Sequence, residues 1–436
     1  MCYLRPSGVF FVIVIRMSAF VKAHSGAKIR IPNYDDDCIA QLPAFFQNTL
    51  LGNRDDPLTH QIANKVRLGG VKNVVFFLVD GFGATQWETY KPKYNALQRF
   101  EQDGYLGNLD SVFPSSTPVA LNTLHANGLL PAQHGLIDWW LYVEEIDKII
   151  ATLPFAAMGS EQRDSLIKIG AKPSILLDNP TTYELFEKQG IKTRAFIPKG
   201  YLQSVCTKTT YKGSELVPYE KVSDLFAALS NELAKPQEKP SYNFVYLDRI
   251  DGTGHEFGPD SIEYERVVKV YFTALDDFLA KANDMKSTLF VISADHGQVN
   301  VGPKEIIYLD KLVDLSGSFR VSAQGNLILP WGGKREMFLA IKDDKQSEVL
   351  NLLQDIIGDY VEIVETERAL KAGLFGHASV KHPHLKSRLG DVLVLPKGNK
   401  TVWYHHPDEE PYKLKGEHGG LSDAELKVPF GLLRLN

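Results

Sequence analysis

Residues 73–81 read Asn73-Val-Val-Phe-Phe-Leu-Val-Asp80-Gly81, a short apolar run that ends in a carboxylate and a glycine. Runs this short and this apolar, bounded by glycine and charge, are typical of strands covered on both faces of a parallel sheet. Two later runs have the same form, Tyr242-Asn-Phe-Val-Tyr-Leu-Asp248 and Thr288-Leu-Phe-Val-Ile-Ser-Ala-Asp295. Together the three runs predict a central sheet whose strands are mostly parallel.

Each run leads into side chains that bind divalent metal ions, and a fourth stretch, Gly416-Glu-His-Gly-Gly420, adds one more. These side chains are Asp80, Asp251, His255, Asp295, His296 and His418. In open α/β sheets the ligand crevice lies beyond the carboxyl ends of the strands, so we expect the six to meet at one edge. Carboxylate and imidazole suit Zn²⁺, and Mn²⁺ or Fe²⁺ less selectively. The set is enough for two divalent ions and favours metal-assisted hydrolysis.

Each of these elements also has a purely structural interpretation when it is taken alone. A single aspartate at a strand end is more often a helix N-cap than a ligand. Asp295-His296-Gly297 is a turn or capping feature about as often as it is a site. Four such elements in this order favour a metal site over local structure.

The candidate nucleophile is Thr117, in Phe113-Pro-Ser-Ser-Thr-Pro118. A helix is expected to follow over residues 119–127 and to end at Gly128, with Pro118 at its first position. A hydroxyl at a helix N-terminus faces unpaired N–H groups, which favour an alkoxide and a bound phosphate. A nearby metal ion would lower the hydroxyl pKa further. The alternative is that Ser116 or Thr117 only caps the helix.

Segments with strand and helix patterns alternate along the chain, which predicts the α/β class. The 436 residues are enough for one large domain with a substantial insertion. We expect a catalytic core formed by residues 17–302 and 386–436, with an α+β cap or insertion at 303–385. The central sheet is expected to resume at residues 390–395.

Further elements are expected from the spacing of apolar residues. Inside the insertion, a helix over 345–357 should lie between strands at 336–341 and 360–364. In the core, strands are expected at 108–113 and 193–197, and helices at 36–51, 58–68, 94–100, 181–189 and from Asp260 onward, where Glu263 follows as in a capping box.

Composition excludes several classes of protein. The net charge of -5 and pI near 6.2 argue against a nucleic-acid coat protein and against a cationic membrane binder. The three cysteines, Cys2, Cys38 and Cys206, are far apart and in no metal-binding spacing, so no disulfide framework is expected.

The first sixteen residues are interpreted separately from the fold. Residues 8–15 are apolar but too short to span a bilayer, and no proper cleavage signal follows. We interpret residues 1–16 as an over-extended start, with translation beginning at Met17 and the protein in the cytoplasm. The alternative is a poor signal segment and a secreted protein, with a mature end at residues 24–27.

The order of these motifs resembles the alkaline phosphatase superfamily, and within it the type I phosphodiesterase/nucleotide pyrophosphatase family. The resemblance covers about residues 70–300 and 385–435. It implies an alkaline-phosphatase-like central sheet flanked by helices, and two zinc ions. One ion would be held by Asp251, His255 and His418, and the other by Asp80, Asp295, His296 and the Thr117 oxygen. Thr117 would attack phosphorus in line and form a phosphothreonine intermediate.

The chain departs from the family pattern at two positions. The family usually has an aromatic residue after the threonine, whereas this chain has Pro118, which lacks an N–H. The family also has an asparagine after the His-Gly that follows the nucleophile helix, and residues 134–140 contain none. We expect oxyanion contacts from the Thr117 N–H or from another side chain such as Arg249. The aromatic residues Trp139, Trp140 and Tyr142 would form a wall for a base or pack in the core.

The expected activity is hydrolysis of phosphodiester or nucleotide pyrophosphate bonds in a small phosphorylated substrate such as a nucleotide. Two divalent ions against three carboxylates leave the site near +1, which matches a monoanionic diester. The alternatives are a phosphonate or phosphate monoester hydrolase, and an inactive relative that binds a phosphorylated ligand. A sulfatase is excluded because no arginine follows Ser116 and Pro118 in the required spacing. A transferase acting on membrane lipids is disfavoured because the sequence has no transmembrane span.

Overall fold

The computed structural model describes residues 30–435, except residues 63, 236–237, 283–284, 286, 378 and 407–412. The N-terminal segment 1–16 lies outside the described residues, so its interpretation and the expected cytoplasmic location stay predictions. Within the described ranges, no helix is both long enough and apolar enough to cross a membrane.

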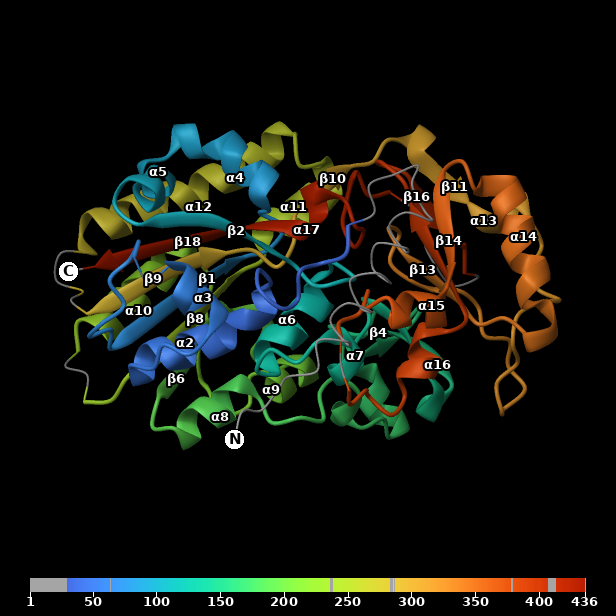
Figure 1. Cartoon of the computed structure of the whole chain (residues 1–436), viewed down its shortest axis with the longest axis horizontal. Coiled ribbons are helices and arrows are strands. Elements are labelled where there is room, and N and C mark those ends of the chain that lie inside the picture. Colours follow the sequence, from blue (N-terminus) through green and yellow to red (C-terminus); the bar gives the residue numbers. More distant parts are fainter. Residues whose placement is uncertain are drawn as a thin grey trace, which may run out of the picture.

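A seven-stranded sheet forms the centre of the larger part of the molecule (Figure 1). Its strands, in spatial order, are β2 (Tyr105–Asp110), β18 (Lys427–Leu435), β9 (Thr288–Ser293), β1 (Asn73–Val79), β8 (Ser241–Leu247), β6 (Lys192–Pro198) and β7 (Glu215–Tyr219). β18 runs antiparallel to both of its neighbours, and the other pairings are parallel. The predicted mostly parallel sheet is confirmed.

β1 is buried on both faces because helices cover both sides of the sheet. Every residue of this strand is buried. Val74 and Phe76 pack into one hydrophobic cluster, and Val75 and Phe77 pack into another on the opposite side. Burying each such side chain contributes about 1.5–3 kcal/mol to folding, which explains the continuous apolar run where an alternating pattern would suit a half-exposed strand.

The helices divide between the two faces of the sheet. One face carries α2 (Leu42–Leu51), α3 (Pro57–Ile62), α6 (Thr117–His125) and α8 (Thr182–Lys188). The other carries α4 (Ala84–Tyr90), α5 (Asn95–Gln102), α10 (Val222–Leu233) and α12 (Ile262–Ala280). In Figure 1, α4, α5 and α12 lie above the sheet, and α2 and α8 lie below it. This three-layer arrangement confirms the α/β class.

Three helices begin at positions different from those expected. α2 begins at Leu42, later than the predicted residue 36, with a proline in its first turn where the missing N–H is tolerated. α6 begins at Thr117 with Ser116 as N-cap, so Pro118 is the second helical residue. α12 begins after Ser261, whose hydroxyl accepts a hydrogen bond from the Tyr264 N–H, so Asp260 is not its cap.

A smaller α+β lobe, orange in Figure 1, lies beside the central sheet. Its antiparallel sheet has the order β12 (Trp331–Gly332), β13 (Met337–Leu339), β15 (Val392–Pro396) and β14 (Val361–Glu365). The predicted helix is present as α14 (Gln346–Ile357), which packs on this sheet. The expectation that the central sheet resumes at residues 390–395 is wrong, because β15 pairs with β13 and β14. The domain boundaries at 302/303 and 385/386 stay predictions.

The remaining strands form three small sheets. They are β3 (Trp140–Val143), β4 (Lys148–Ala151) and β5 (Ala156–Ala157); β10 (Val299–Asn300) and β17 (Gly416–Glu417); and β11 (Ile306–Tyr308) and β16 (Thr401–Trp403). The remaining α-helices are α7 (Pro131–His134), α9 (Val205–Thr210), α11 (Arg249–Phe257), α13 (Leu309–Leu312), α15 (Thr366–Lys371), α16 (Leu385–Leu389) and α17 (Asp423–Leu426).

A buried ion pair joins the smaller lobe to the loop that carries His418. The guanidinium of Arg335, between β12 and β13, donates two hydrogen bonds of 2.8 Å to the Glu425 carboxylate on α17. Glu425 also accepts a 2.9 Å hydrogen bond from the Gly420 N–H. Such a pair is costly to break because the remaining charge would stay buried. It therefore holds the 418–420 loop in place against the central sheet.

Candidate active site

Three strands that are neighbours in the sheet bring the predicted metal-binding residues together. β9, β1 and β8 are adjacent and parallel, so their carboxyl ends meet at one edge. Asp80 follows β1 directly, Asp295 follows β9 by two residues, and Asp251 lies in the helix that follows β8. The crevice expected at this edge is therefore formed by strand order.

Asp80, Asp295 and His296 form one group at the floor of the crevice. The His296 Nε2 lies 3.5 Å from a carboxylate oxygen of Asp80 and 3.5 Å from one of Asp295. All three side chains are almost completely buried. The Thr117 Oγ1 lies 3.0 Å from His296 Nε2 and 3.4 Å from an oxygen of Asp80. The first turn of α6 thus delivers the predicted nucleophile to this group.

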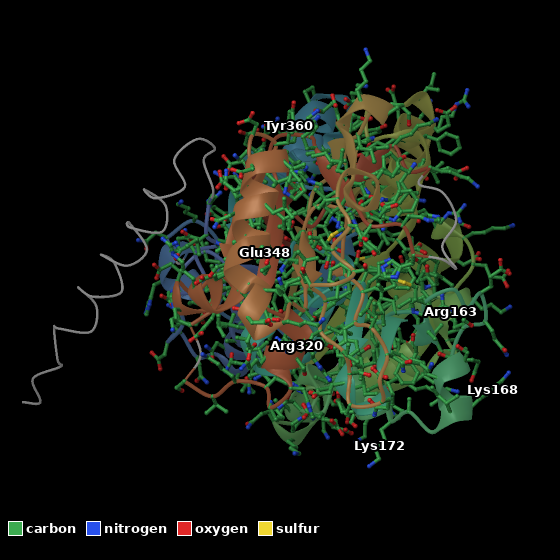
Figure 2. The ribbon with its side chains drawn as sticks, turned by 90° about the vertical axis from the view of Figure 1, so that its right-hand side faces the viewer. Arg163, Lys168, Lys172, Arg320, Glu348 and Tyr360 are labelled. Atoms are coloured by element: carbon green, nitrogen blue, oxygen red, sulfur yellow. The ribbon has the colours of Figure 1, made fainter. Side chains whose placement is uncertain are left out.

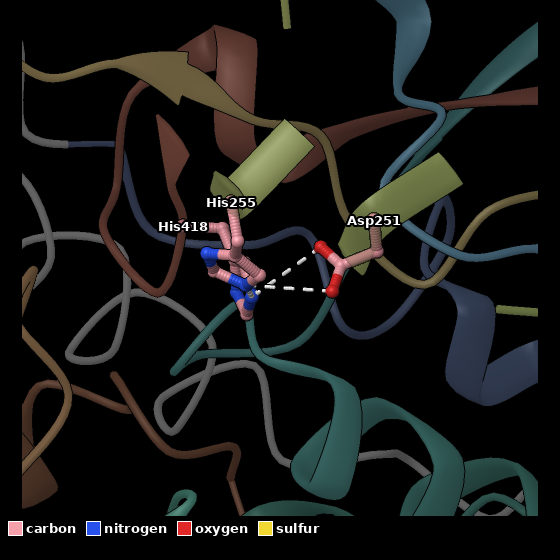
Figure 3. Close-up of side chains that lie close together, drawn as sticks. All are labelled: Asp251, His255 and His418. Carbon is pink, nitrogen blue, oxygen red and sulfur yellow. Dashed lines mark hydrogen bonds and ion pairs between the residues drawn. The ribbon is translucent and has the colours of Figure 1, made fainter. Parts of the chain in front are cut away.

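Asp251, His255 and His418 form the second group, and Figure 3 shows their side chains pointing toward one another. The Asp251 carboxylate lies 3.4 Å from His255 Nε2 and 3.7 Å from His418 Nε2. Asp251 and His255 lie one turn apart on α11, where residues i and i+4 share a face. Between them, Gly254 leaves room for the Gln298 side chain, since a Cβ at this position would lie 1.8 Å from the Gln298 Oε1.

The three histidines are oriented by backbone carbonyl groups. The Nδ1 of His255 lies 2.8 Å from the Gly416 oxygen, and that of His418 lies 3.0 Å from the Ser115 oxygen. The Nδ1 of His296 lies 3.1 Å from the carbonyl oxygen of the next residue. A carbonyl oxygen only accepts, so each Nδ1 carries the proton and each Nε2 presents a lone pair.

The donor atoms fit a divalent cation at each group. The Nε2 atoms of His255 and His418 face each other at 3.1 Å, and two lone pairs at that distance repel unless a cation or proton lies between them. Within the described residues, one oxygen of Asp295 is buried without a hydrogen-bond partner. Burial and the nearby Asp295 and Asp251 carboxylates hold the pKa of Asp80 well above its usual range. Positive charge at this edge would relieve all three conditions.

The comparison with known families agrees with this geometry. A family model described as type I phosphodiesterase/nucleotide pyrophosphatase matches residues 74–421. The chain belongs to this family of hydrolases. The resemblance inferred from the motif order is confirmed, and the matched range includes Asp80, Thr117 and His418.

Curated relatives match this family member over part of their length. Venom phosphodiesterase CdcPDE of Crotalus durissus collilineatus is 25% identical over 55% of this chain and 28% of its own length. Human ectonucleotide pyrophosphatase/phosphodiesterase family member 1 is 24% identical over 54% of this chain and 24% of its own length. The match thus spans about a quarter of the length of these relatives.

Solved structures of related proteins have the same fold. Murine ectonucleotide pyrophosphatase/phosphodiesterase 5 aligns with a TM-score of 0.61 and 17% identity, over 83% of this chain and 89% of its own. The human form aligns with a TM-score of 0.61 and 14% identity, over 83% of this chain and 87% of its own. The predicted fold class is therefore confirmed.

The grouping expected from the family resemblance coincides with the two groups in the structure. Asp251, His255 and His418 lie together, and Thr117 lies against the group that contains Asp80. The roles of these residues as ligands and nucleophile stay predictions. The described residues therefore contain two groups able to hold a divalent ion, and the identity of the ion belongs to the proposal below.

Two residues that support the site were missed by sequence reasoning. The Tyr246 hydroxyl donates a hydrogen bond to Asp80, and the Gln298 amide donates to Asp251. Tyr246 is the sixth residue of the apolar strand β8, where an aromatic residue signals only packing. Gln298 lies two residues after His296, and its nearness to that predicted ligand was the one feature of the sequence that could have indicated a role at the site.

The Tyr246→Phe variant is expected to weaken metal binding about tenfold while the protein stays folded. The lost hydroxyl holds one Asp80 oxygen and lowers the pKa of that carboxylate, against the larger effect of burial. Titration of the metal-free protein by calorimetry measures the change. Tyr242→Phe is the matched control, because Tyr242 lies on the same strand and contacts no predicted ligand. Equal affinities in the two variants would remove the role assigned to Tyr246.

A cavity of about 400 Å³ opens above the two groups. Thr117, Asp80 and Asp251 line its floor, and its walls carry the cations Arg163 and Arg249. Arg163 comes from the segment that connects β5 to α8 and is labelled beside Lys168 in Figure 2. The structure thus places Arg249, the expected oxyanion contact, in the same cavity as Thr117, and its contact with phosphate stays a prediction.

Three aromatic residues were expected either to form a wall for a base or to pack in the core. One of them lines the cavity, and the other two pack in a hydrophobic cluster. Trp139 is 38% exposed and lines the cavity. Trp140 and Tyr142 lie on β3 and belong to the hydrophobic cluster beneath it, where Tyr142 packs on Trp331 at 5.6 Å between ring centroids. Only Trp139 is therefore available to a substrate.

His125 and His134 are buried away from the predicted ligands. The His125 Nδ1 lies 3.1 Å from the Tyr183 hydroxyl, and the His134 Nε2 lies 3.1 Å from the Thr123 hydroxyl. Burial lowers the pKa of each histidine to about 3, so both are neutral. They support the packing of α6 and α7, and neither contacts a predicted metal ligand.

Proposed function

We propose that this protein is a two-metal hydrolase of phosphodiester or nucleotide pyrophosphate bonds, with Thr117 as covalent nucleophile. The position of the Thr117 hydroxyl carries the proposal. It lies in the first turn of α6, 3.0 Å from His296 Nε2 and beside Asp80, on the floor of an open cavity. A hydroxyl buried in packing would have no route to a substrate.

Asp80, Asp295 and His296 would hold one ion together with the Thr117 oxygen, and Asp251, His255 and His418 would hold the other. Zn²⁺ fits this mixture of carboxylate and imidazole donors best, with Mn²⁺ or Fe²⁺ as less selective fits. When bound, such ions lower the pKa of a hydroxyl and neutralise charge on a transferring phosphoryl group. They would leave a site near +1, which matches a monoanionic diester.

The residues of the chain would act in two steps. Thr117 Oγ attacks phosphorus, a bond from Thr117 to phosphorus forms, and the bond to the leaving oxygen on the opposite side breaks. Water then cleaves the phosphothreonine and restores the hydroxyl. The Thr117 N–H at the start of α6 orients a phosphoryl oxygen, a role that Pro118 cannot share, and the Val119 and Ala120 N–H groups already donate to the Ser116 carbonyl.

A nucleotide is the substrate class favoured by the comparisons. One solved structure of murine ectonucleotide pyrophosphatase/phosphodiesterase 5, an inactive variant, is described as a complex with AMP. In this chain, Trp139 is exposed at the cavity and provides an aromatic surface for a base. Phosphate monoesters and phosphonates are the second candidate class, because the same groups would hold a single phosphoryl group.

We expect the metal-loaded protein to hydrolyse bis-p-nitrophenyl phosphate faster than p-nitrophenyl phosphate, and a chelator to abolish both reactions. Release of p-nitrophenolate measures each rate. Return of activity on addition of Zn²⁺ after the chelator is removed separates metal loss from unfolding. Faster monoester hydrolysis would place the protein with phosphatases. Turnover of neither compound by protein that contains zinc would contradict the proposal.

A further inference from the structure

A second, larger hollow adjoins the candidate active site. It has a volume of about 720 Å³ and lies between the ends of β6 and β7 and the first half of α12. Three residues, Tyr201, Asp248 and Arg249, line both hollows. A molecule bound over Thr117 can therefore continue past these residues into the second hollow.

Two of the residues shared by the hollows contact each other. The Tyr201 hydroxyl donates a 2.7 Å hydrogen bond to Asp248. The Arg163 guanidinium lies over the Tyr201 ring, 5.6 Å from its centre. Tyr201 follows β6 and Asp248 follows β8, which is one of the strands whose ends form the edge of the active site, and β6 is its neighbour in the sheet. The second hollow is thus an extension of the same strand-end crevice.

Arg249 and Arg266 supply two unpaired positive charges to the second hollow. Both are exposed, and within the described part of the chain neither side chain makes an ion pair or a hydrogen bond. Nearby cations do have partners: Lys93 lies 2.7 Å from Glu265, and Lys199 lies 2.5 Å from Glu220.

Two carboxylates also line the hollow. Glu220 is neutralised by its ion pair with Lys199, and Asp248 accepts a hydrogen bond from the Tyr201 hydroxyl. An unpaired guanidinium matches phosphate or carboxylate with two parallel hydrogen bonds. The chain as a whole has a net charge of -5, so a hollow with two unpaired arginines is a locally positive region that favours an anionic ligand.

Apart from its charged residues, this hollow is lined mostly by apolar and aromatic side chains. Tyr219 and Tyr271 form part of its wall and are largely buried. Val270, on the same face, is 59% exposed. Apolar surface beside two cations suits an organic group that carries an anion, and it does not suit a neutral sugar or a bare cation.

We propose that the second hollow binds a distal anionic group, phosphate or carboxylate, of the same substrate whose phosphodiester is cleaved at Thr117. Arg249 and Arg266 bind that group, and Arg249 also faces the scissile phosphate. This inference rests on the proposed function and narrows its substrate class to phosphodiesters with a second negative charge.

The test compares two substrates that share the scissile bond and the leaving group. Thymidine 5′-(p-nitrophenyl phosphate) has one phosphate, and its 3′-phosphorylated form has a second. We expect the wild type to prefer the second compound about tenfold in kcat/KM, the scale of a charge-assisted hydrogen bond. Arg249→Gln and Arg266→Gln should each remove most of that preference. Because the readout is a ratio, a general loss of activity in either variant cancels.

Arg368→Gln is the matched control, because Arg368 is an exposed arginine on α15 in the smaller lobe. It should retain the full preference. Equal kcat/KM for the two compounds in the wild type, or an unchanged preference in the double variant Arg249→Gln/Arg266→Gln, would overturn the inference while the proposed function stands.

A binding measurement separates failure of the inference from failure of the proposed function. If neither these compounds nor bis-p-nitrophenyl phosphate is hydrolysed, the proposed function fails, and calorimetry with thymidine 3′,5′-bisphosphate and thymidine 5′-phosphate still tests the hollow. Tighter binding of the bisphosphate by the wild type, lost in the double variant and kept in Arg368→Gln, supports it. Equal affinities contradict it.

Discussion

The Thr117→Ala variant is expected to lose diester hydrolysis by about 10⁴-fold or more, the scale observed when a covalent nucleophile is removed. Among the described residues, the Thr117 hydroxyl alone contacts the His296 side chain, and the Asp80 carboxylate is contacted by the hydroxyls of Thr117 and Tyr246. Fold and metal content should be preserved, because the carboxylate and imidazole ligands remain. The rate of p-nitrophenolate release from bis-p-nitrophenyl phosphate measures the loss.

Two companion variants make this result specific. Thr117→Ser keeps a hydroxyl and should retain activity within about tenfold of the wild type, since only a methyl group is lost. Ser116→Ala removes the neighbouring hydroxyl, which is buried and belongs to neither group of predicted ligands. It should leave most of the activity. Loss of activity in Ser116→Ala with survival in Thr117→Ala would move the nucleophile to Ser116.

The Asp251→Asn variant is expected to bind one divalent ion per chain where the wild type binds two, and to lose diester hydrolysis by about 10³-fold or more. Asparagine has the shape of aspartate and can still accept the hydrogen bond from Gln298, so the change removes charge with little change in packing. His418→Ala should have the same effect, because His418 belongs to the same group. Elemental analysis of the purified proteins measures the ion content.

Glu256→Gln is the control for this experiment. Glu256 is an exposed carboxylate on α11, next to His255, and belongs to neither group. Its replacement removes the same charge from the same helix and should leave two ions bound. Unchanged ion content in both Asp251→Asn and His418→Ala would refute the ligand assignment. If Glu256→Gln lost an ion as well, the loss would follow from the removal of negative charge near the site and not from the loss of a ligand.

The central sheet was predictable because its strands are buried on both faces. The continuous apolar runs in β1, β8 and β9 have that one common cause, and their parallel pairing followed from it. The same pattern, a continuous apolar run, led to the wrong prediction that β15 belongs to the central sheet. Its run of Val and Leu is as apolar as β1, but it pairs with β13 and β14 in the smaller lobe. An apolar run shows that a strand is covered, and it does not show by which sheet.

Motif order and family resemblance were enough to predict which ligands group together. They could not predict which residues hold those ligands in place by hydrogen bonds. Tyr246 and Gln298 reach Asp80 and Asp251 by hydrogen bonds across the crevice. Neither has a spacing relative to its partner that a pattern could detect, because the contacts join different strand ends. The second hollow was equally hidden, since Arg249 and Arg266 become neighbours only when α11 and α12 pack.

The sequence by itself determined the covered strands, the carboxylates and histidines that follow them, and the hydroxyl at the start of α6, because each is a local pattern of burial or residue type. Only the tertiary structure decided which residues meet. Strand order brought Asp80 between the ends of β9 and β8, helix α11 brought Asp251 and His255 to one face, and the folded loop brought His418 to them. Distances between segments far apart in the chain depend on the packing of the whole core, which no local pattern contains.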